Sequence, residues 1–317
     1  ETIRAKEKRG SLLWVLDKTK TAMGGRLLRA WMERPLLSPA QITRRLSAVE
    51  ELVKKTIDRE ELILSLREIT DFERAMTRIM TGTASCRDLA ALSQGAASLP
   101  AVKERLSGMR APYLQALFEQ LDTLADLKEK IDATIVDDPP FLLREGGLIR
   151  DGANKELDEL RAVQSGGKGM LTQIEAREKE KTGIRNLRVG YNRVFGYYIE
   201  VTKSNLDLVP LRYSRKQTLA GAERYVTPEL QEIEHKILNA QQMALTLEST
   251  LFASVREAIA AEIGAVQQNA MVLKTADALL SLAQVAREND YVKPTINEGG
   301  ALTIVEGRHP IVERTVT

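Results

Sequence analysis

The chain has 317 residues, which is enough for about two domains of ~150 residues each. Hydrophobic residues make up 43% of it and charged residues 28%, an ordinary balance for a soluble globular protein. With 46 basic and 44 acidic residues, the net charge of +2 is too small to indicate nucleic-acid binding by itself. Any binding to nucleic acid must therefore depend on where the charges lie in the chain.

The cysteine and histidine content excludes two further classes. Cys86 is the single cysteine, so no intramolecular disulfide can form and a secreted, disulfide-stabilised fold is not expected. With only His235 and His309 beside it, a Cys/His zinc site is not expected either. We interpret Cys86 as a small buried or capping residue. No apolar run reaches the ~18 residues of a membrane span, and the N-terminus lacks the shape of a signal peptide.

Residues 10–135 predict a packed bundle of short to medium helices. Met23, Leu27, Leu28 and Trp31 share one helical face. Pro35 is expected to end that helix, because proline has no N–H and clashes with the preceding turn. The short connections between such segments are typical of a bundle.

Two helix starts follow in this region. Ser38, Pro39 and Gln41 predict an N-cap, a proline in the first turn and a capping box. Asp58 and Glu61 repeat the same spacing and predict a second capped start.

Two long helices are expected after a loop at 137–152. The first covers 153–181, where leucine and isoleucine recur at spacings of three and four, although Gly166 and Gly167 interrupt the pattern. The second begins at Thr227 and Pro228 and continues to about Ala261, which makes it ~50 Å long. Each needs a partner for its apolar seam, so we expect an antiparallel pair.

Between the two helices the period changes from helical to two. Leu187–Tyr191 and Phe195–Val201 alternate as strands, with a turn at Asn192 and Arg193. Arg215–Leu219 and Ala222–Val226 predict two more strands, so a small antiparallel sheet is inserted at the tip of the helical pair. A last strand-like segment, Ala301–Val305, precedes a turn at His309 and Pro310.

The inserted module carries the charge asymmetry that the whole chain lacks. Residues 185–224 hold eight basic and three acidic side chains, a difference of 8 − 3 = +5. Basic side chains among tyrosines and small polar residues are typical of phosphate contacts. The opposite interpretation is that Tyr191, Phe195 and Tyr197 form the core of the sheet and the arginines only solvate its outer face. The charge pattern leaves both interpretations open.

Patterns for an enzyme are weak. No G-x-x-x-x-G-K-[ST] loop is present, and Gly166-Gly167-Lys168 lacks its spacing and its hydroxyl residue. Asp137 and Asp138 precede two prolines, which favours a loop over a metal site. Two histidines do not assemble a Ser/His/Asp set. We therefore expect no catalytic residue, no metal and no bound cofactor in this chain.

Several motifs, in order, resemble the MutS family of DNA mismatch-recognition proteins. The run G-I-R-N-L-R-V-G-Y-N-R-V-F-G-Y-Y at Gly183–Tyr198 resembles the clamp of that family, and R-K-Q-T-L-A-G-A-E-R-Y at Arg215–Tyr225 and T-P-E-L at Thr227–Leu230 continue it. L-D-K-T-K-T-A-M-G-G-R-L-L at Leu16–Leu28 and G-T-A-S-C-R-D-L at Gly82–Leu89 resemble its core. E-G-R-H-P at Glu306–Pro310 resembles the entry to its ATPase domain.

The resemblance implies a mainly α fold with five parts. These are a helical core domain at 1–150, a descending lever helix at 151–179, a β-rich DNA clamp at 180–227, an ascending lever helix with a return to the core at 228–290, and the start of an incomplete ATPase domain at 291–317. The clamp would contact the phosphate backbone of double-stranded DNA and would not read the base sequence. Relatives without a clamp fit less well, because the strand module is complete.

The resemblance also implies what lies outside this sequence. We expect a fragment without the mismatch-binding domain (no Phe-x-Glu occurs), without the connector and without the Walker A loop. The intact protein would bind ATP and Mg²⁺, pair with a second MutS subunit and a partner of the MutL type, and lie in the bacterial cytoplasm at the nucleoid. ATP binding would open or close the clamp through the levers.

The candidate DNA-contacting residues are selected by charge and by position at strand ends, since the motif assigns no roles one by one. They are Asn192, Arg193, Lys203, Ser204, Arg215, Lys216, Gln217, Thr218 and Arg224. A second hypothesis stays open: the long helices form a structural coiled-coil arm for dimerisation, and the basic module has no DNA affinity.

Overall fold

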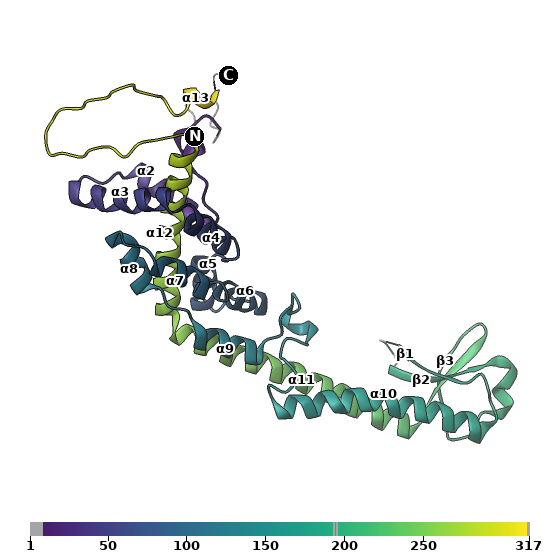
Figure 1. Cartoon of the computed structure of the whole chain (residues 1–317). Coiled ribbons are helices and arrows are strands. Elements are labelled where there is room, and N and C mark those ends of the chain that lie inside the picture. Colours follow the sequence, from purple (N-terminus) through teal and green to yellow (C-terminus); the bar gives the residue numbers. More distant parts are fainter. Residues whose placement is uncertain (1–8, 193, 195, 316–317) are drawn as a thin grey trace. The chain divides into compact units, whose positions relative to one another are not determined.

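The computed structural model describes residues 9–192, 194 and 196–315. By internal contacts the chain divides into two compact units. Unit 1 is Glu1–Pro139 with Ser254–Thr317, and unit 2 is Pro140–Ala253. The finer division into five functional parts stays a prediction. The expected mainly α fold with one small antiparallel sheet is confirmed (Figure 1).

Unit 1 is a helical bundle built around α12, Ile263–Glu288 (Figure 1). The helices that pack on α12 are α1 (Leu12–Leu16), α2 (Ala22–Glu33), α3 (Pro39–Lys54), α4 (Thr56–Arg67), α5 (Phe72–Met80) and α8 (Pro112–Gln120). The remaining helices of unit 1 are α6 (Cys86–Ala96), α7 (Leu99–Ser107), α9 (Ala125–Thr134) and α13 (Val312–Thr315). Fourteen residues of α12 are buried, so this helix is apolar on most of its circumference, as a central helix must be.

Two of the three helix boundaries predicted in unit 1 are confirmed. Ser38 caps α3 with Pro39 in its first turn, α2 ends at Glu33 just before Pro35, and Cys86 is buried at the start of α6. The second capping prediction is wrong. Asp58 lies inside α4, which begins at Thr56 without a side-chain cap, so its position in the first turn supports the helix dipole instead.

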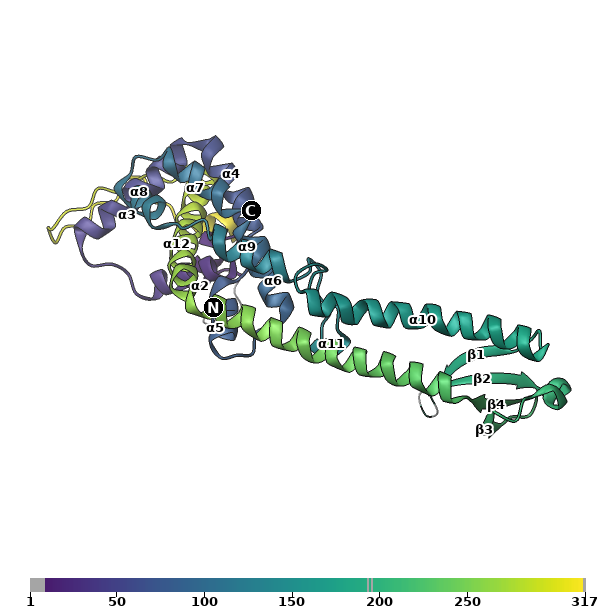
Figure 2. The same ribbon diagram turned by 90° about the horizontal axis from the view of Figure 1, so that it is seen from below.

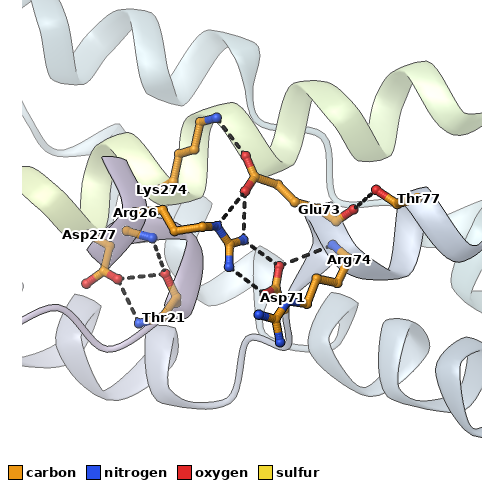
Figure 3. A network of polar contacts seen from close by, with 9 residues as sticks. Thr21, Arg26, Asp71, Glu73, Arg74, Thr77, Lys274 and Asp277 are labelled. Carbon is orange, nitrogen blue, oxygen red and sulfur yellow. Dashed lines mark hydrogen bonds and ion pairs between the residues drawn. The ribbon is translucent and has the colours of Figure 1, made fainter. Parts of the chain in front are cut away.

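A buried carboxylate fixes the start of α2. Asp277 on α12 is 1% exposed and accepts hydrogen bonds from the backbone N–H groups of Lys20 (2.9 Å) and Thr21 (2.7 Å) and from the Thr21 hydroxyl (2.7 Å; Figure 3). The same hydroxyl accepts from the N–H of Gly24, which makes Thr21 the N-cap. Burial raises the pKa of Asp277, and these donors oppose that shift. A Cβ on Gly24 would lie 2.2 Å from the Asp277 carboxylate, so the glycine is required by the close approach.

A second ion network joins α2, α5 and α12. Arg26 donates to both oxygens of Asp71 (2.9 and 3.0 Å) and to Glu73 (2.7 Å), and Lys274 donates to the other oxygen of Glu73 (2.7 Å; Figure 3). Partial burial by itself raises the pKa of both carboxyl groups. The hydrogen bonds from Arg26 and Lys274 outweigh it, so both pKa values are lowered.

Unit 2 contains two long helices that lie side by side and antiparallel (Figure 2). They are α10, Lys155–Thr182, and α11, Pro228–Ala261, of which residues 228–253 belong to this unit. Their ends match the expected ranges closely. A short 3-10 turn, η1 (Leu143–Glu145), precedes α10.

The helix predicted at 153–181 is confirmed, and α10 runs through the glycine pair without a break. Gly167 is buried, and a Cβ there would lie 2.4 Å from the Ile237 side chain on α11, whereas a Cβ on Gly166 would meet nothing within 4 Å. Gly167 therefore permits close packing of the two helices. A second contact lies nearer the start of α10, where Arg161 pairs with the buried carboxylate of Glu248 at 2.6 Å.

The sheet has the strand order β1-β2-β4-β3 and is antiparallel throughout. The strands are β1 (Arg188–Asn192), β2 (Gly196–Thr202), β3 (Ser214–Thr218) and β4 (Ala222–Val226), and a 3-10 segment, η2 (Lys203–Leu208), follows β2. A cluster of buried apolar side chains packs the sheet against both long helices. The members are Leu171, Ile174, Ile184, Leu187, Ile199, Val201, Tyr213, Tyr225, Leu230 and Ile237.

Two sequence expectations about this part of the chain need correction. Tyr191 lies in β1, but its side chain is 52% exposed and its ring packs on that of Tyr197 at 4.9 Å between centroids, so it is not a core residue. Phe195, predicted to be core, lies outside the described residues. Residues 301–305 do not form a strand, because no described segment pairs with their backbone.

None of the helices in the described part of the chain combines the length and apolar character needed to cross a membrane. Likewise, the described residues contain no group of three or more His, Cys, Asp or Glu side chains that could hold a metal ion.

Asp277→Asn tests the buried carboxylate in unit 1. The amide presents an NH₂ group toward backbone donors that need an acceptor, so we expect the free energy of unfolding to fall by about 2–3 kcal/mol. The measurement is chemical denaturation of the full chain. Asp126→Asn, an exposed residue of α9, is the matched control, and equal effects of the two variants would contradict the role of Asp277.

Arg26→Gln tests the ion network through its pH dependence. Because the folded-state pKa values of Asp71 and Glu73 are lowered, their contribution to stability is present above their unfolded values of about 4 and is lost as the pH falls through the folded values. Unfolding free energies measured between about pH 6 and pH 3 should therefore fall less steeply for Arg26→Gln than for the unchanged chain. Arg29→Gln, which removes an exposed pair with Glu33, should keep the original slope.

A pair of neighbouring substitutions tests the helix contact in unit 2. Gly166→Ala should stabilise the chain by about 0.5–1 kcal/mol, because alanine is the better helix former and the site is open. Gly167→Ala should destabilise it by about 1–3 kcal/mol, since the new methyl group overlaps Ile237. Thermal melts compare the two, and a stabilising Gly167→Ala would show that the helices are not closely packed there.

Candidate nucleic-acid interface

Two carboxylates near the end of α10 hold the sheet in place. Glu175 accepts a hydrogen bond from the backbone N–H of Val189 in β1 at 2.9 Å, and Glu178, which is 4% exposed, accepts from the Tyr213 hydroxyl at 2.7 Å and from Arg212. The hydrogen bond from Lys179, followed by that from Val189, lowers the pKa of Glu175. Burial, followed by the bond to Glu178, raises the pKa of Tyr213. The first edge strand and the entry to β3 are thus tied to the same helix.

The other side of the module is continuous with α11. β4 ends at Val226, and the next residue, Thr227, accepts a hydrogen bond from the N–H of Leu230 at 3.2 Å as the cap of α11, with Pro228 in the first turn. Arg177 on α10 pairs with Glu229 in that first turn. The expected cap and proline are confirmed, and they make the strand run directly into the helix.

The outer face of the sheet carries an arginine that is fully engaged by its neighbours. Arg224 donates to Glu200 at 3.0 Å and to Gln217 at 2.9 Å, and its guanidinium lies 4.1 Å from the centroid of the Tyr198 ring. The Tyr198 ring also covers Gly190, where a Cβ would lie 2.7 Å from it. The side chain of Arg224 is only 18% exposed. Arg224 is therefore less available to a ligand than an exposed arginine would be.

Arg215 shows the opposite arrangement. Its side chain is 64% exposed, and its Nη1 lies 3.3 Å from Oε1 of Glu223, which is nearly buried. The Tyr225 hydroxyl donates to the other oxygen of Glu223 at 2.5 Å. This hydrogen bond, together with the charges of Arg215 and Lys203, lowers the pKa of Glu223. Burial and the bond to Glu223 raise the pKa of Tyr225 to about 12.

The structure places several of the predicted contact residues at opposite ends of the sheet. Lys203, Ser204, Gln217 and Thr218 gather at the end of the sheet where β2 finishes and the β3–β4 hairpin turns, since Thr202 is opposite Ala222 and Thr218 is opposite Glu223. The N–H of Lys203 donates to the carbonyl of Gly221 at 3.1 Å, which joins η2 to that hairpin. Asn192 lies at the opposite end of the sheet, where its side chain accepts from the N–H of Val194. Arg193 lies outside the described residues.

β3 is an edge strand with a register shift between Arg215 and Gln217, so Lys216 lies in a β-bulge. Charged side chains and a bulge on an exposed edge prevent strand pairing with other chains. We call Lys203, Arg215 and Lys216 the β3 basic edge. All three side chains are exposed, and Lys203 and Arg215 both act on Glu223.

Ion pairs decide how much of the positive charge is available. Arg212, Arg215 and Arg224 each have a carboxylate partner, namely Glu178, Glu223 and Glu200. Within the described part of the chain, four exposed cations of the module have no such partner. They are Arg185, Arg188, Lys203 and Lys216. Arg185 and Arg188 were counted in the charge of the module but not selected as contacts. The exposed position of Arg188 in β1 could have been read from the strand alternation, whereas Arg185 precedes the strand.

Comparisons with known proteins agree with the fold. A model of the family described as MutS domain III matches residues 1–283. The chain is 49% identical over 314 residues to the DNA mismatch repair protein MutS of Ruminiclostridium cellulolyticum, covering 99% of this chain and 36% of that protein. It is 47% identical over 315 residues to the DNA mismatch repair protein MutS of Desulforamulus reducens, with the same coverage of each.

The chain therefore spans about a third of the length of the curated relatives it matches. Because the family model covers most of the chain, this chain belongs to the MutS domain III family.

Proposed function

We propose that this chain is the part of a DNA mismatch repair protein that holds duplex DNA through its phosphate backbone. The observation that carries the proposal is the concentration of exposed basic side chains on the small sheet of unit 2, in a chain whose overall charge is nearly balanced. Lys203, Lys216 and the exposed guanidinium of Arg215 can each donate to a phosphate oxygen. Neighbouring hydroxyls of Ser204 and Thr218 add neutral donors at the same end of the sheet.

Such contacts give affinity without sequence preference. Phosphates have the same charge at every base pair, so lysine and arginine contacts position the duplex but do not specify bases. Binding of this kind releases condensed counterions, and its affinity falls steeply with salt. The module should therefore bind matched and mismatched duplexes alike.

The whole-protein activity belongs to the same proposal. The relatives are named as DNA mismatch repair proteins and are about three times longer than this chain. We propose that ATP with Mg²⁺ is bound by another part of the protein, that a second subunit and a MutL-type partner join it in the bacterial cytoplasm, and that α10 and α11 transmit changes to the sheet. The continuity of β4 with α11 and the ties of β1 to α10 support such a transmission, because movement of either helix must move the sheet.

The alternative is a structural arm that serves dimerisation. The long antiparallel pair of α10 and α11 favours it, since exposed apolar side chains such as Val163, Met170 and Met243 could pack on a second copy. It predicts concentration-dependent self-association and no affinity for DNA. Sedimentation of the chain at ~1 µM and DNA titration under the same conditions separate the two hypotheses.

The direct test is fluorescence anisotropy of a labelled duplex, matched or carrying one mismatch, titrated with the chain at several salt concentrations. We expect weak binding with a steep salt dependence and the same affinity for both duplexes. Absence of binding at low salt would contradict DNA contact by this chain.

Reversal of the charges on β3 tests the surface. Arg215→Glu combined with Lys216→Glu should weaken binding to matched and mismatched duplexes by the same factor and reduce the salt slope by about two ions. Lys155→Glu combined with Arg67→Glu makes the same change of net charge at exposed positions that are not part of the sheet and should have a much smaller effect. Loss of binding to only one of the duplexes would contradict backbone contact.

A further inference from the structure

We propose that Glu223 is an internal competitor of the DNA phosphates for Arg215, so that this carboxylate keeps the affinity of the β3 basic edge low. The inference rests on the proposed function, because it concerns the regulation of the same surface. It assigns a role to an acidic residue within a module whose other charges are mostly positive.

The geometry makes Glu223 a substitute for a phosphate. Oε1 of Glu223 lies 3.3 Å from Nη1 of Arg215, and the charge of Lys203 also acts on this carboxylate. One of the three cations of the β3 basic edge, Arg215, is therefore paired with an anion that belongs to the protein. An incoming phosphate oxygen therefore competes with that anion for the guanidinium of Arg215.

The two partners differ in freedom of movement. The side chain of Glu223 is 9% exposed and the Tyr225 hydroxyl holds its second oxygen at 2.5 Å, so the carboxylate stays beneath the surface. The side chain of Arg215 is 64% exposed and can turn toward solvent. Exchange thus requires movement of the arginine alone, and the carboxylate remains in place to recapture it when DNA leaves.

The ion pair of Arg215 and Glu223 is expected to be weak enough to reduce DNA affinity without abolishing it. Ion pairs with an exposed partner are weak, so a phosphate can displace Glu223, but the displacement lowers the gain from each contact. A protein that must release or move along DNA benefits from contacts that are individually weak and rapidly reversible. Lys216 has no acidic partner in the described part of the chain, so it contributes its full charge in either state.

Glu223→Gln tests the competition, because it removes the charge while keeping the shape and an acceptor for Tyr225. Duplex affinity in low salt should rise about threefold to tenfold, and the salt slope should become steeper by up to one ion. Asp207→Asn is the matched control. It makes the same change of net charge at an exposed residue of the same module without freeing an arginine, and it should change affinity less than about twofold.

A double-mutant cycle identifies the arginine. In an Arg215→Gln background, Glu223→Gln should have no more effect than Asp207→Asn, because no competition remains. Glu223→Asp provides a variant of unchanged net charge, in which the shorter side chain draws the carboxylate away from Arg215, and it too should raise affinity. Melting curves of each variant confirm that the module is folded, and if Glu223→Gln is not, the Asp variant carries the test.

The outcomes separate this inference from the proposed function. If the unchanged chain binds no DNA, the proposed function fails. If the unchanged chain binds DNA and Glu223→Gln or Glu223→Asp leaves the affinity unaltered, or if Asp207→Asn raises it equally, the competition by Glu223 is overturned and net charge alone governs binding.

Discussion

The contact on which the candidate interface most depends is the buried carboxylate of Glu178. It receives the Tyr213 hydroxyl and the Arg212 guanidinium just before β3 begins, and so fixes the entry to the strand that carries Arg215 and Lys216. A buried charge without partners would be strongly unfavourable, which means that this part of the chain must meet α10 in the same way whenever the module is folded. This contact therefore fixes the position of the two residues of the β3 basic edge that lie on β3.

The carboxylates of the module also determine which cations can act on a ligand. A count over the sequence gives a surplus of five positive charges for residues 185–224, and every cation contributes equally to it. In the folded module, Arg224 is held between Glu200, Gln217 and the ring of Tyr198, while Lys216 projects from a bulge without an acidic partner among the described residues. Arg224 and Lys216 have the same charge but differ in how readily they can bind a phosphate, because only Arg224 is paired with side chains of neighbouring strands.

In unit 1, paired polar and charged groups likewise fix the positions of structural elements, here of helices. Its central helix, α12, is buried on most sides, yet Asp277 and Lys274 bring charged groups to the start of α2 and to the α2–α5 contact. Each of these groups meets backbone donors or opposite charges, so the polar contacts select one arrangement of helices that apolar packing alone would leave less specific.

The sequence by itself determined the elements with strong local signals. Alternation predicted β1 and β2, and the two segments on either side of Gly221 were predicted as further strands. Caps and prolines predicted the starts of α3 and α11, and the motifs predicted a mainly α fold of the family that the comparisons show. These features depend on residues close together in the chain, where spacing and backbone preference decide the outcome. The expected strand at 301–305 lacked a partner to pair with, and partner strands are not encoded locally.

Only the tertiary structure decided the features that depend on distant residues. Gly167 is a point of close helix packing because Ile237, seventy residues later, occupies the space of its missing side chain. Arg215 and Arg224 differ in availability because Glu223 and Glu200 lie across different strand pairs, with different burial. Burial and pairing are properties of the folded arrangement, so neither spacing nor net charge in the sequence could have distinguished these residues.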